Sequence, residues 1–197
     1  MPSSLLGDGA DMADSTNSEP TPGRSDDFEP PSGPGVLSHI NQRGEARIVD
    51  ITGKVATQRR ALARCRVALS PEALDVLNDD HDVRRLFGEA TVIGIMAAKR
   101  TSRLIPLCHP IKVDHVDLAL RVVEGGVEIE AIAEAFERTG LEMEALTACA
   151  IAALSIVGAF RKFEPKPTIG DLTLWEKSGG RSGNWMRSPD ASTPSVT

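Results

Sequence analysis

An α+β fold with an antiparallel sheet is predicted by three observations in this 197-residue sequence. Apolar and polar residues alternate over residues 60–69, and again on both sides of a Glu-Gly-Gly turn at 124–126, which indicates strands and a β-hairpin. Two long stretches, 84–103 and 139–163, lack this alternation and have the length and composition of helices. A last strand-like segment covers residues 168–176. This order of elements predicts a ferredoxin-like βαββαβ sheet with helices on one face.

The first strand and the helices after it have local signals of their own. In residues 60–69 small and apolar side chains alternate with arginines, so one face of this strand is predicted to be basic. Ser70 and Pro71 have the order of a helix cap followed by a first-turn proline, and predict a short helix. In the longer helix, Gly88 and Gly94 each lower the helix propensity by about 1 kcal/mol relative to alanine, and small residues there indicate close packing on the sheet.

The second half of the chain contains the hairpin and another long helix. Residues 116–122 and 127–135 alternate on either side of the turn, as expected for two antiparallel strands. Thr139 and Glu142 have the Thr-x-x-Glu spacing of a capping box and predict the start of the helix there. This helix is predicted to end near Phe163 and, because it is apolar on nearly every side, to be buried.

Acidic charge and proline are concentrated in the first 35 residues. This stretch holds seven acidic residues and one basic residue, whereas the rest of the chain carries 21 of each sign and is formally neutral. Six of the 13 prolines also lie there. We therefore predict an acidic, disordered leader at 1–36, one domain at 37–185 and a flexible tail at 186–197.

The composition argues against several classes of protein. The chain has no uninterrupted apolar run of membrane-spanning length, and its acidic N-terminus is not a secretory signal, so neither a membrane span nor secretion is predicted. Its three cysteines are far apart, which argues against a disulfide framework and a zinc site; no metal or cofactor is predicted, and the cytoplasm is the expected location. A neutral domain without tyrosine argues against a nucleic-acid interface, including an RNA-binding module of this fold.

Two segments near the middle of the chain contain residues suited to binding an anionic ligand. Leu107, Cys108 and His109 lie between two prolines; the histidine could bind a phosphate or transfer a proton, or it could fill space in a rigid connector. Lys99 and Arg100 could contact a phosphate, but two cations at the end of a helix also stabilise its dipole. The residues alone do not choose between these functions.

Two further segments lie at the start of the second long helix and after the last strand. The predicted capping box explains the presence of Glu142. Glu144 is two residues further on and therefore points in a different direction, where it could accept hydrogen bonds from the adjacent N–H groups of a guanine-like ring. The glycine-rich residues 177–183 carry Lys177 and Arg181 and could hold an anion through backbone N–H groups, or could be a flexible exit from the strand. Their spacing is not that of a Walker phosphate-binding loop.

Six strings in residues 37–185 are specific when taken together. They are SHI at 38–40, VDI at 49–51, GIMAAKRT at 94–101, LIPLCHP at 104–110, TGLEMEALT at 139–147 and KSGGRSG at 177–183. In this order they resemble the MoaC family of enzymes of molybdenum cofactor biosynthesis. The resemblance implies a ferredoxin-like fold and a hexamer built as a trimer of dimers, with the sites at subunit interfaces.

The resemblance also implies a reaction and a set of residues. The expected substrate is a small nucleotide derivative, cyclised dihydro-GTP, and the expected products are cyclic pyranopterin monophosphate and pyrophosphate. By motif match the substrate would be bound by Leu107, Cys108, His109, Glu142, Met143 and Glu144. Lys99 and Lys177 match catalytic lysines of the family, and Arg100 and Arg181 would bind phosphate.

Three positions depart from the family pattern. Gly158 stands where the family has a catalytic aspartate, and Arg161 stands where it has a lysine; a further lysine, expected before the first long helix, has no counterpart in residues 83–85. Glycine cannot accept a proton, and arginine remains protonated at neutral pH. Two hypotheses follow: the chain catalyses the usual reaction with substitute groups, or it is a repurposed homologue that binds or converts a related purine nucleotide or pterin.

Overall fold

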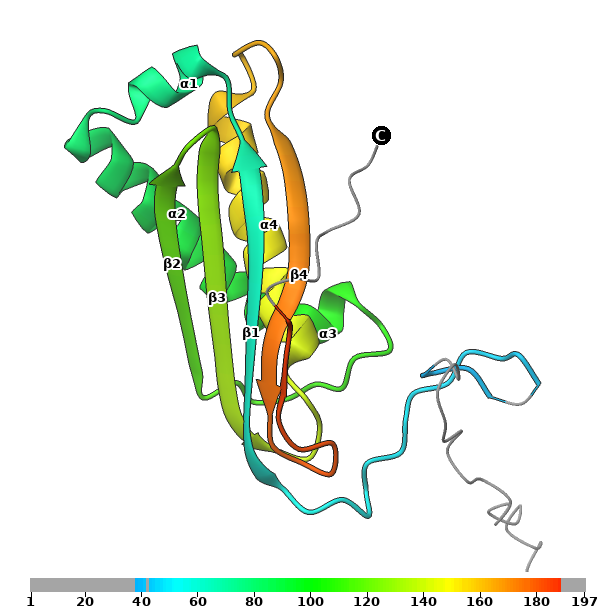
Figure 1. Cartoon of the computed structure of the whole chain (residues 1–197). Helices are drawn as coiled ribbons and strands as arrows, with labels where there is room; N and C mark the ends of the chain where they lie inside the picture. Colours follow the sequence, from blue (N-terminus) through cyan, green and yellow to red (C-terminus); the bar gives the residue numbers. More distant parts are fainter. Residues whose placement is uncertain (1–37, 42, 189–197) are drawn as a thin grey trace, which may run out of the picture. The chain divides into compact units, whose positions relative to one another are not determined.

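The computed structural model describes residues 38–41 and 43–188 (Figure 1). The predicted leader at 1–36 and most of the predicted tail lie outside the described residues. The elements, in chain order, are β1 (Thr57–Ala68), α1 (Pro71–Val76), α2 (Asp80–Ala98), α3 (Thr101–Leu104), β2 (His115–Val123), β3 (Gly126–Glu137), α4 (Glu142–Phe160), β4 (Thr168–Ser178) and β5 (Trp185–Met186).

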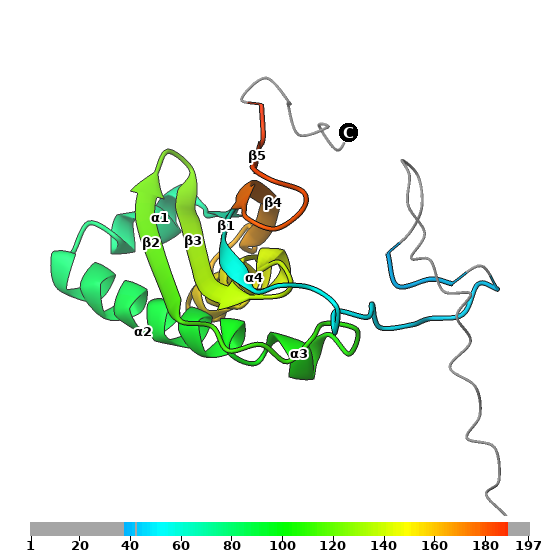
Figure 2. The same cartoon turned by 90° about the horizontal axis from the view of Figure 1, so that it is seen from below.

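The strands form one antiparallel sheet in the order β2-β3-β1-β4-β5. Helices α2 and α4 pack side by side on one face of this sheet (Figures 1 and 2). The predicted ferredoxin-like α+β fold is therefore confirmed, including the strand order along the chain and the placement of the helices. The short strand β5, which pairs Trp185 with Lys177, was not predicted from the sequence.

The two faces of β1 differ as the alternating pattern predicted. Its small and apolar side chains point into the core beneath α2 and α4, and those of Ala61, Ala63 and Val67 are completely buried. The arginines on the opposite face each lie across from a glutamate of β3. Arg64, for example, donates a 2.7 Å hydrogen bond to Glu130. Such partly exposed ion pairs add little stability, so the buried face holds the sheet to the helices.

The first long helix begins earlier and ends earlier than the sequence predicted. The carboxylate of Asp79 accepts hydrogen bonds from the backbone N–H groups of His81 and Asp82, which caps α2 before the predicted start of the helix at residue 84. At its other end the Thr101 hydroxyl donates to the Ala98 carbonyl at 2.9 Å. The continuous helix predicted over 84–103 is thus divided into α2 and α3, with Lys99 and Arg100 between them.

Helix α4 is the central helix of the core, but its start differs from the prediction. It begins at Glu142 with Leu141 as the cap residue and no side-chain cap hydrogen bond, so the predicted capping box is wrong. By length and composition alone α4 could cross a membrane, but it packs against β1, β3, β4 and α2 as a core helix does. Its outer side is exposed at Met143, Leu154 and Gly158, so the prediction of complete burial holds for only part of its surface.

Candidate active site

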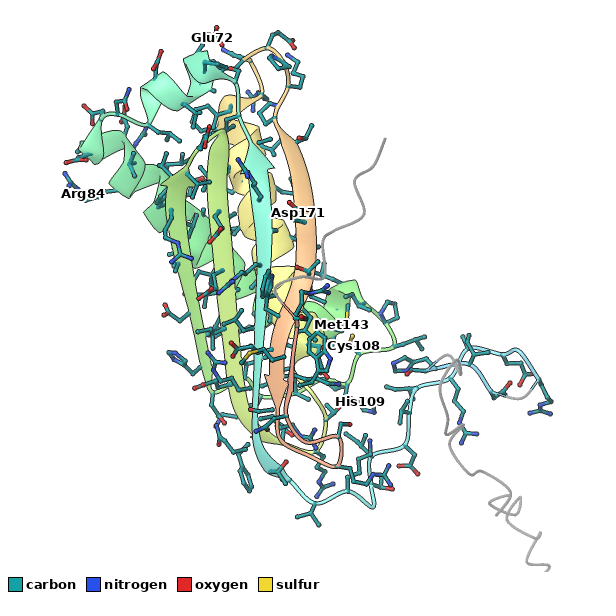
Figure 3. All side chains as sticks on the ribbon, in the orientation of Figure 1. Glu72, Arg84, Cys108, His109, Met143 and Asp171 are labelled. Atoms are coloured by element: carbon teal, nitrogen blue, oxygen red, sulfur yellow. The ribbon has the colours of Figure 1, made fainter. Side chains whose placement is uncertain are left out.

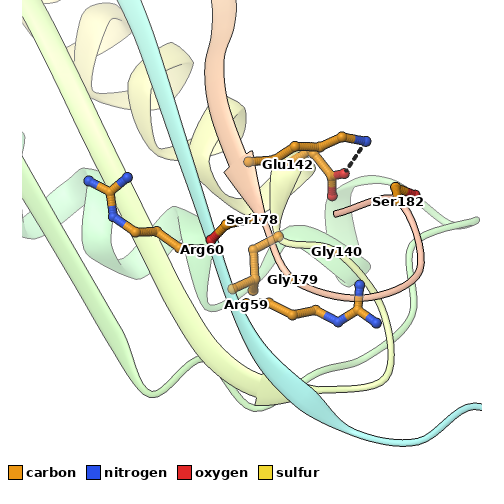
Figure 4. A pocket seen from close by; sticks show the side chains of 9 residues that line it. Arg59, Arg60, Gly140, Glu142, Ser178, Gly179 and Ser182 are labelled. Atoms are coloured by element: carbon orange, nitrogen blue, oxygen red, sulfur yellow. Dashed lines mark hydrogen bonds and ion pairs between the residues drawn. The ribbon is translucent and has the colours of Figure 1, made fainter. Parts of the chain in front are cut away.

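The end of β4 and the start of α4 bring opposite charges together. Lys177 Nζ lies 3.2 Å from Glu142 Oε1, and each side chain is about one-third exposed (Figure 4). Because Gly140 has no side chain, it leaves room for the Glu142 carboxylate in this position. A Cβ at residue 140 would lie only 1.8 Å from Glu142 Oε2. Glu142 therefore pairs with the lysine of the KSGGRSG string instead of capping its own helix.

Arg59 is a part of this pocket that the sequence analysis missed. It lines the pocket together with Lys177, Ser178, Gly179 and Ser182 (Figure 4). Its guanidinium is fixed by donating from Nε to the Glu137 carbonyl at 2.8 Å and from Nη2 to the Arg138 carbonyl at 3.2 Å. A signal was present in the sequence, because Arg59 lies in the same period-two phase as the buried Ala61 and Ala63.

The glycine-rich loop after β4 lies close against β1. At Gly179, where φ is +90°, an added Cβ would lie 2.1 Å from the Gln58 carbonyl oxygen. At Gly180, where φ is +70°, it would meet the Arg59 guanidinium. Both positions need glycine, for the positive φ and for the space. The loop is thereby held beside two cations, Lys177 and Arg59.

Glu144 is buried in the first turn of α4. Only 4% of the residue is exposed. Burial, reinforced by the nearby charge of Glu142, raises its pKa to about 7, while a backbone hydrogen bond opposes the shift. Near neutral pH this carboxyl group is therefore present in both protonation states, and it can accept or donate a proton. Because Glu144 is two residues after Glu142 in the helix, the two side chains point in different directions. Glu144 is therefore buried, whereas Glu142 contacts Lys177.

The Leu-Cys-His string forms a turn after α3, in which the Cys108 N–H donates to the Ile105 carbonyl at 3.0 Å. In the view of Figure 3, Cys108 is drawn beside Met143 of α4, and His109 follows it in the same loop. Burial, and secondarily the charge of Glu144, raise the pKa of the Cys108 thiol. This direction disfavours the thiolate, which is the form of cysteine that acts as a nucleophile.

His109 has a defined hydrogen-bond partner. Its Nε2 lies 2.7 Å from the backbone oxygen of Val49. Because a carbonyl can only accept, Nε2 must carry the proton, and Nδ1 of the neutral ring remains as an acceptor. The contact links the LIPLCHP string to the VDI string, two segments that are 60 residues apart.

Other predicted site residues lie apart from this group within one chain. Lys99 and Arg100 are exposed between α2 and α3 and do not line the depressions around Lys177 and Arg181. Gly158 is near the far end of α4, and an added Cβ there would meet no atom within 4 Å. Arg161, which follows the helix, is also exposed.

A metal centre has little support in the described part of the chain. Ligand atoms of Asp79, His81 and Asp82 lie within 4.8 Å of one another, but the Asp79 carboxylate is already occupied in capping α2. The cysteines are free thiols, and Cys65 and Cys149 are buried in the core. The cations, carboxylates and hydroxyls of the pocket instead suit an anionic organic ligand that carries N–H or O–H groups.

The fold is that of a ferredoxin-like domain, and the composition of its pocket suits an anionic small molecule. Residues 48–180 match the model of the MoaC family. A cyclic pyranopterin monophosphate synthase of Thermomicrobium roseum is 46% identical over 157 residues, which cover 78% of this chain and 95% of that protein. Synthases of the same name from Streptomyces avermitilis (44% identical, 77% and 90% covered) and Geobacter metallireducens (42%, 79% and 99%) are also similar. The chain belongs to the MoaC family and is an enzyme of the lyase class.

Proposed function

We propose that this chain converts cyclised dihydro-GTP to cyclic pyranopterin monophosphate and pyrophosphate. The observation that carries this proposal is the pocket at the start of α4, where Lys177 and Arg59 lie beside Glu142 and the glycine-rich loop. The cations suit a triphosphate, and the loop can approach it closely. Glu144, with its pKa of about 7, suits proton exchange during ring rearrangement. His109 supplies a further proton acceptor at Nδ1.

The arrangement of the predicted residues along α4 supports an oligomer with shared sites. Glu142 and Gly158 are 16 positions apart in this helix, which corresponds to about 24 Å at 1.5 Å per residue. One chain therefore cannot place both ends of α4 against one small substrate. We propose that two copies complete each site, within a hexamer arranged as a trimer of dimers, and that the enzyme acts in the cytoplasm.

Lys177→Ala tests the phosphate-binding part of the proposal. The variant should bind cyclised dihydro-GTP at least about ten-fold more weakly, since one charge-assisted contact of about 1.5–3 kcal/mol is lost. Its affinity should also depend less on salt concentration. Binding is measured by calorimetry at two ionic strengths, with Lys99→Ala in parallel and Arg121→Ala, which removes an exposed cation of the β2–β3 hairpin, as the control. Equal affinity of Lys177→Ala and the wild type would remove Lys177 from the site.

An alternative function is favoured by Gly158 and Arg161. These residues replace an aspartate and a lysine of the family pattern and cannot supply the same proton transfers. In this alternative the chain is a repurposed homologue that binds or converts a related purine nucleotide or pterin. The two functions are distinguished by incubating the enzyme with enzymatically prepared cyclised dihydro-GTP, followed by oxidation and chromatography of the pterin. Product at a catalytic rate supports the synthase; binding without product supports the alternative.

The double variant Gly158→Asp with Arg161→Lys should increase the rate of product formation at least about ten-fold, because general acid–base groups typically contribute 10²–10⁴-fold. Its stability should change by less than about 1 kcal/mol, since an added side chain at 158 meets open space and glycine is a poor helix former. Turnover is measured under single-turnover conditions, and stability by urea unfolding. A folded double variant with no gain over the wild type would show that these two positions do not limit the reaction.

A further inference from the structure

Strand β4 contains a β-bulge at Trp175, two residues before Lys177. The register of its pairing with β1 shifts at this point, because consecutive residues of β1 lie opposite Leu174 and Glu176. Trp175 is therefore an extra residue in the ladder. An extra residue interrupts the alternation of side chains between the two faces of a sheet, and bulges are common beside active sites, where they redirect a side chain.

The bulge determines the face of the sheet on which Lys177 lies. Lys177 is opposite Ala61 of β1, a completely buried residue on the face that packs against the helices. Leu174 is opposite Ala63, which is on the same face. In a regular strand, residues three positions apart point to opposite faces. Without the extra residue at 175, the side chain of Lys177 would point to the open face of the sheet, away from Glu142 of α4.

Arg187 binds two consecutive backbone carbonyls of the bulge. It follows β5, and its backbone N–H donates to the Trp175 carbonyl at 2.8 Å. Its side-chain Nε donates to the Leu174 carbonyl at 3.0 Å, and its guanidinium lies 6.0 Å from the ring centre of Trp185. Arg187 is partly buried, whereas the other residues from 181 to 188 are exposed. Backbone groups that a bulge displaces from the ladder need other partners, and Arg187 supplies donors at this point.

We infer that Arg187 is a positioning residue: it holds the bulge at Trp175 and thereby keeps Lys177 on the helix face, where the amine can contact the substrate. Arg187 does not itself line the pocket of Lys177 and Arg59, so its effect on binding is indirect. The inference rests on the proposed function for the identity of the substrate. It assigns a role to a residue beyond the segment 48–180 that matches the family model.

The test is a double-mutant cycle, measured by calorimetric binding of cyclised dihydro-GTP to the full-length chain. Arg187→Met, which keeps the length of the side chain but removes its donors and its charge, should weaken binding at least about five-fold. In the Lys177→Ala background the same substitution should change the affinity by less than about two-fold, because Arg187 acts through Lys177. Arg187→Lys, which retains the charge and a donor, should stay within about three-fold of the wild type. Arg121→Met, the same substitution in the β2–β3 hairpin, is the matched control and should leave the affinity unchanged.

Hydrogen exchange followed by mass spectrometry tests the bulge without any ligand. In Arg187→Met the backbone amides of residues 174–178 should exchange faster than in the wild type, whereas those of the β2–β3 hairpin should not change. Unchanged exchange in residues 174–178 would overturn the inference. Additive losses of affinity from Arg187→Met and Lys177→Ala would do the same.

The two measurements separate this inference from the proposed function. If the wild-type chain does not bind cyclised dihydro-GTP, the proposed function is wrong, and hydrogen exchange still decides whether Arg187 holds the bulge. If the wild type binds and turns over this substrate but the Arg187→Met variant binds it equally well, only the inference about Arg187 is wrong. If Arg187→Met does not fold, Arg187→Gln, which retains an N–H donor without the charge, takes its place under the same criteria.

Discussion

Glu144→Gln should make the protein more stable at alkaline pH and remove a pH-dependent loss of stability. The pKa of Glu144 is raised from 4.5 to about 7 in the folded protein, so between these values the folded state binds more protons than the unfolded state. Stability from this group is therefore fully present below pH 4.5 and is lost as the pH rises through about 7. The shift corresponds to about 3 kcal/mol. Urea unfolding of both proteins from pH 4.5 to pH 8 measures the difference.

The matched control is Glu89→Gln, because Glu89 is an exposed carboxylate on α2. The free energy of unfolding of this variant should depend on pH as that of the wild type does, since the buried Glu144 is retained. The comparison must be made at one protein concentration, because oligomerisation would change the apparent stability. A difference between Glu144→Gln and the wild type that stays constant across this pH range would contradict the burial of an ionisable Glu144.

Gly94→Val should lower the free energy of unfolding by about 3 kcal/mol, because it inserts a branched side chain where two helices and a strand meet. A Cβ at residue 94 would lie 2.5 Å from Leu118 Cδ2 and 3.1 Å from the backbone oxygen of Ala148. The leucine side chain can move, but the carbonyl belongs to α4 and can shift only if the helix does. Urea denaturation monitored by tryptophan fluorescence and circular dichroism measures the change.

Gly88→Ala in the same helix is the control for the propensity effect alone. An added Cβ at residue 88 meets no atom within 4 Å, so this variant should gain up to about 1 kcal/mol. Opposite signs for the two variants would demonstrate that contact between α2 and α4 decides the effect at residue 94. A stable Gly94→Val variant would show that the helices can separate without cost.

The candidate site could be predicted from the sequence only where its residues lie in continuous strings. Cys108, His109 and Glu144 belong to such strings, and Cys108 comes close enough to Glu144, at the start of α4, for the carboxylate charge to raise the pKa of the thiol. The partner of Glu142 could not be predicted, because Lys177 is 35 residues further along the chain and a local capping pattern offered a competing explanation. Lys99 and Arg100 belong to an equally specific string, yet they lie outside the pocket of a single chain.

The sequence by itself determined the order of the elements and the two faces of β1. Period-two alternation and the Gly-Gly turn are local patterns that follow from strand geometry, so they required no knowledge of distant residues. Only the tertiary structure decided which charges face one another across the sheet edge. The Arg59 guanidinium is held by backbone carbonyls that are 78 and 79 residues further along the chain. The depression lined by Lys54, Arg59 and Arg181 forms because the segment that enters β1 approaches the loop that leaves β4. Antiparallel pairing creates these contacts, and a pattern read along the chain does not include them.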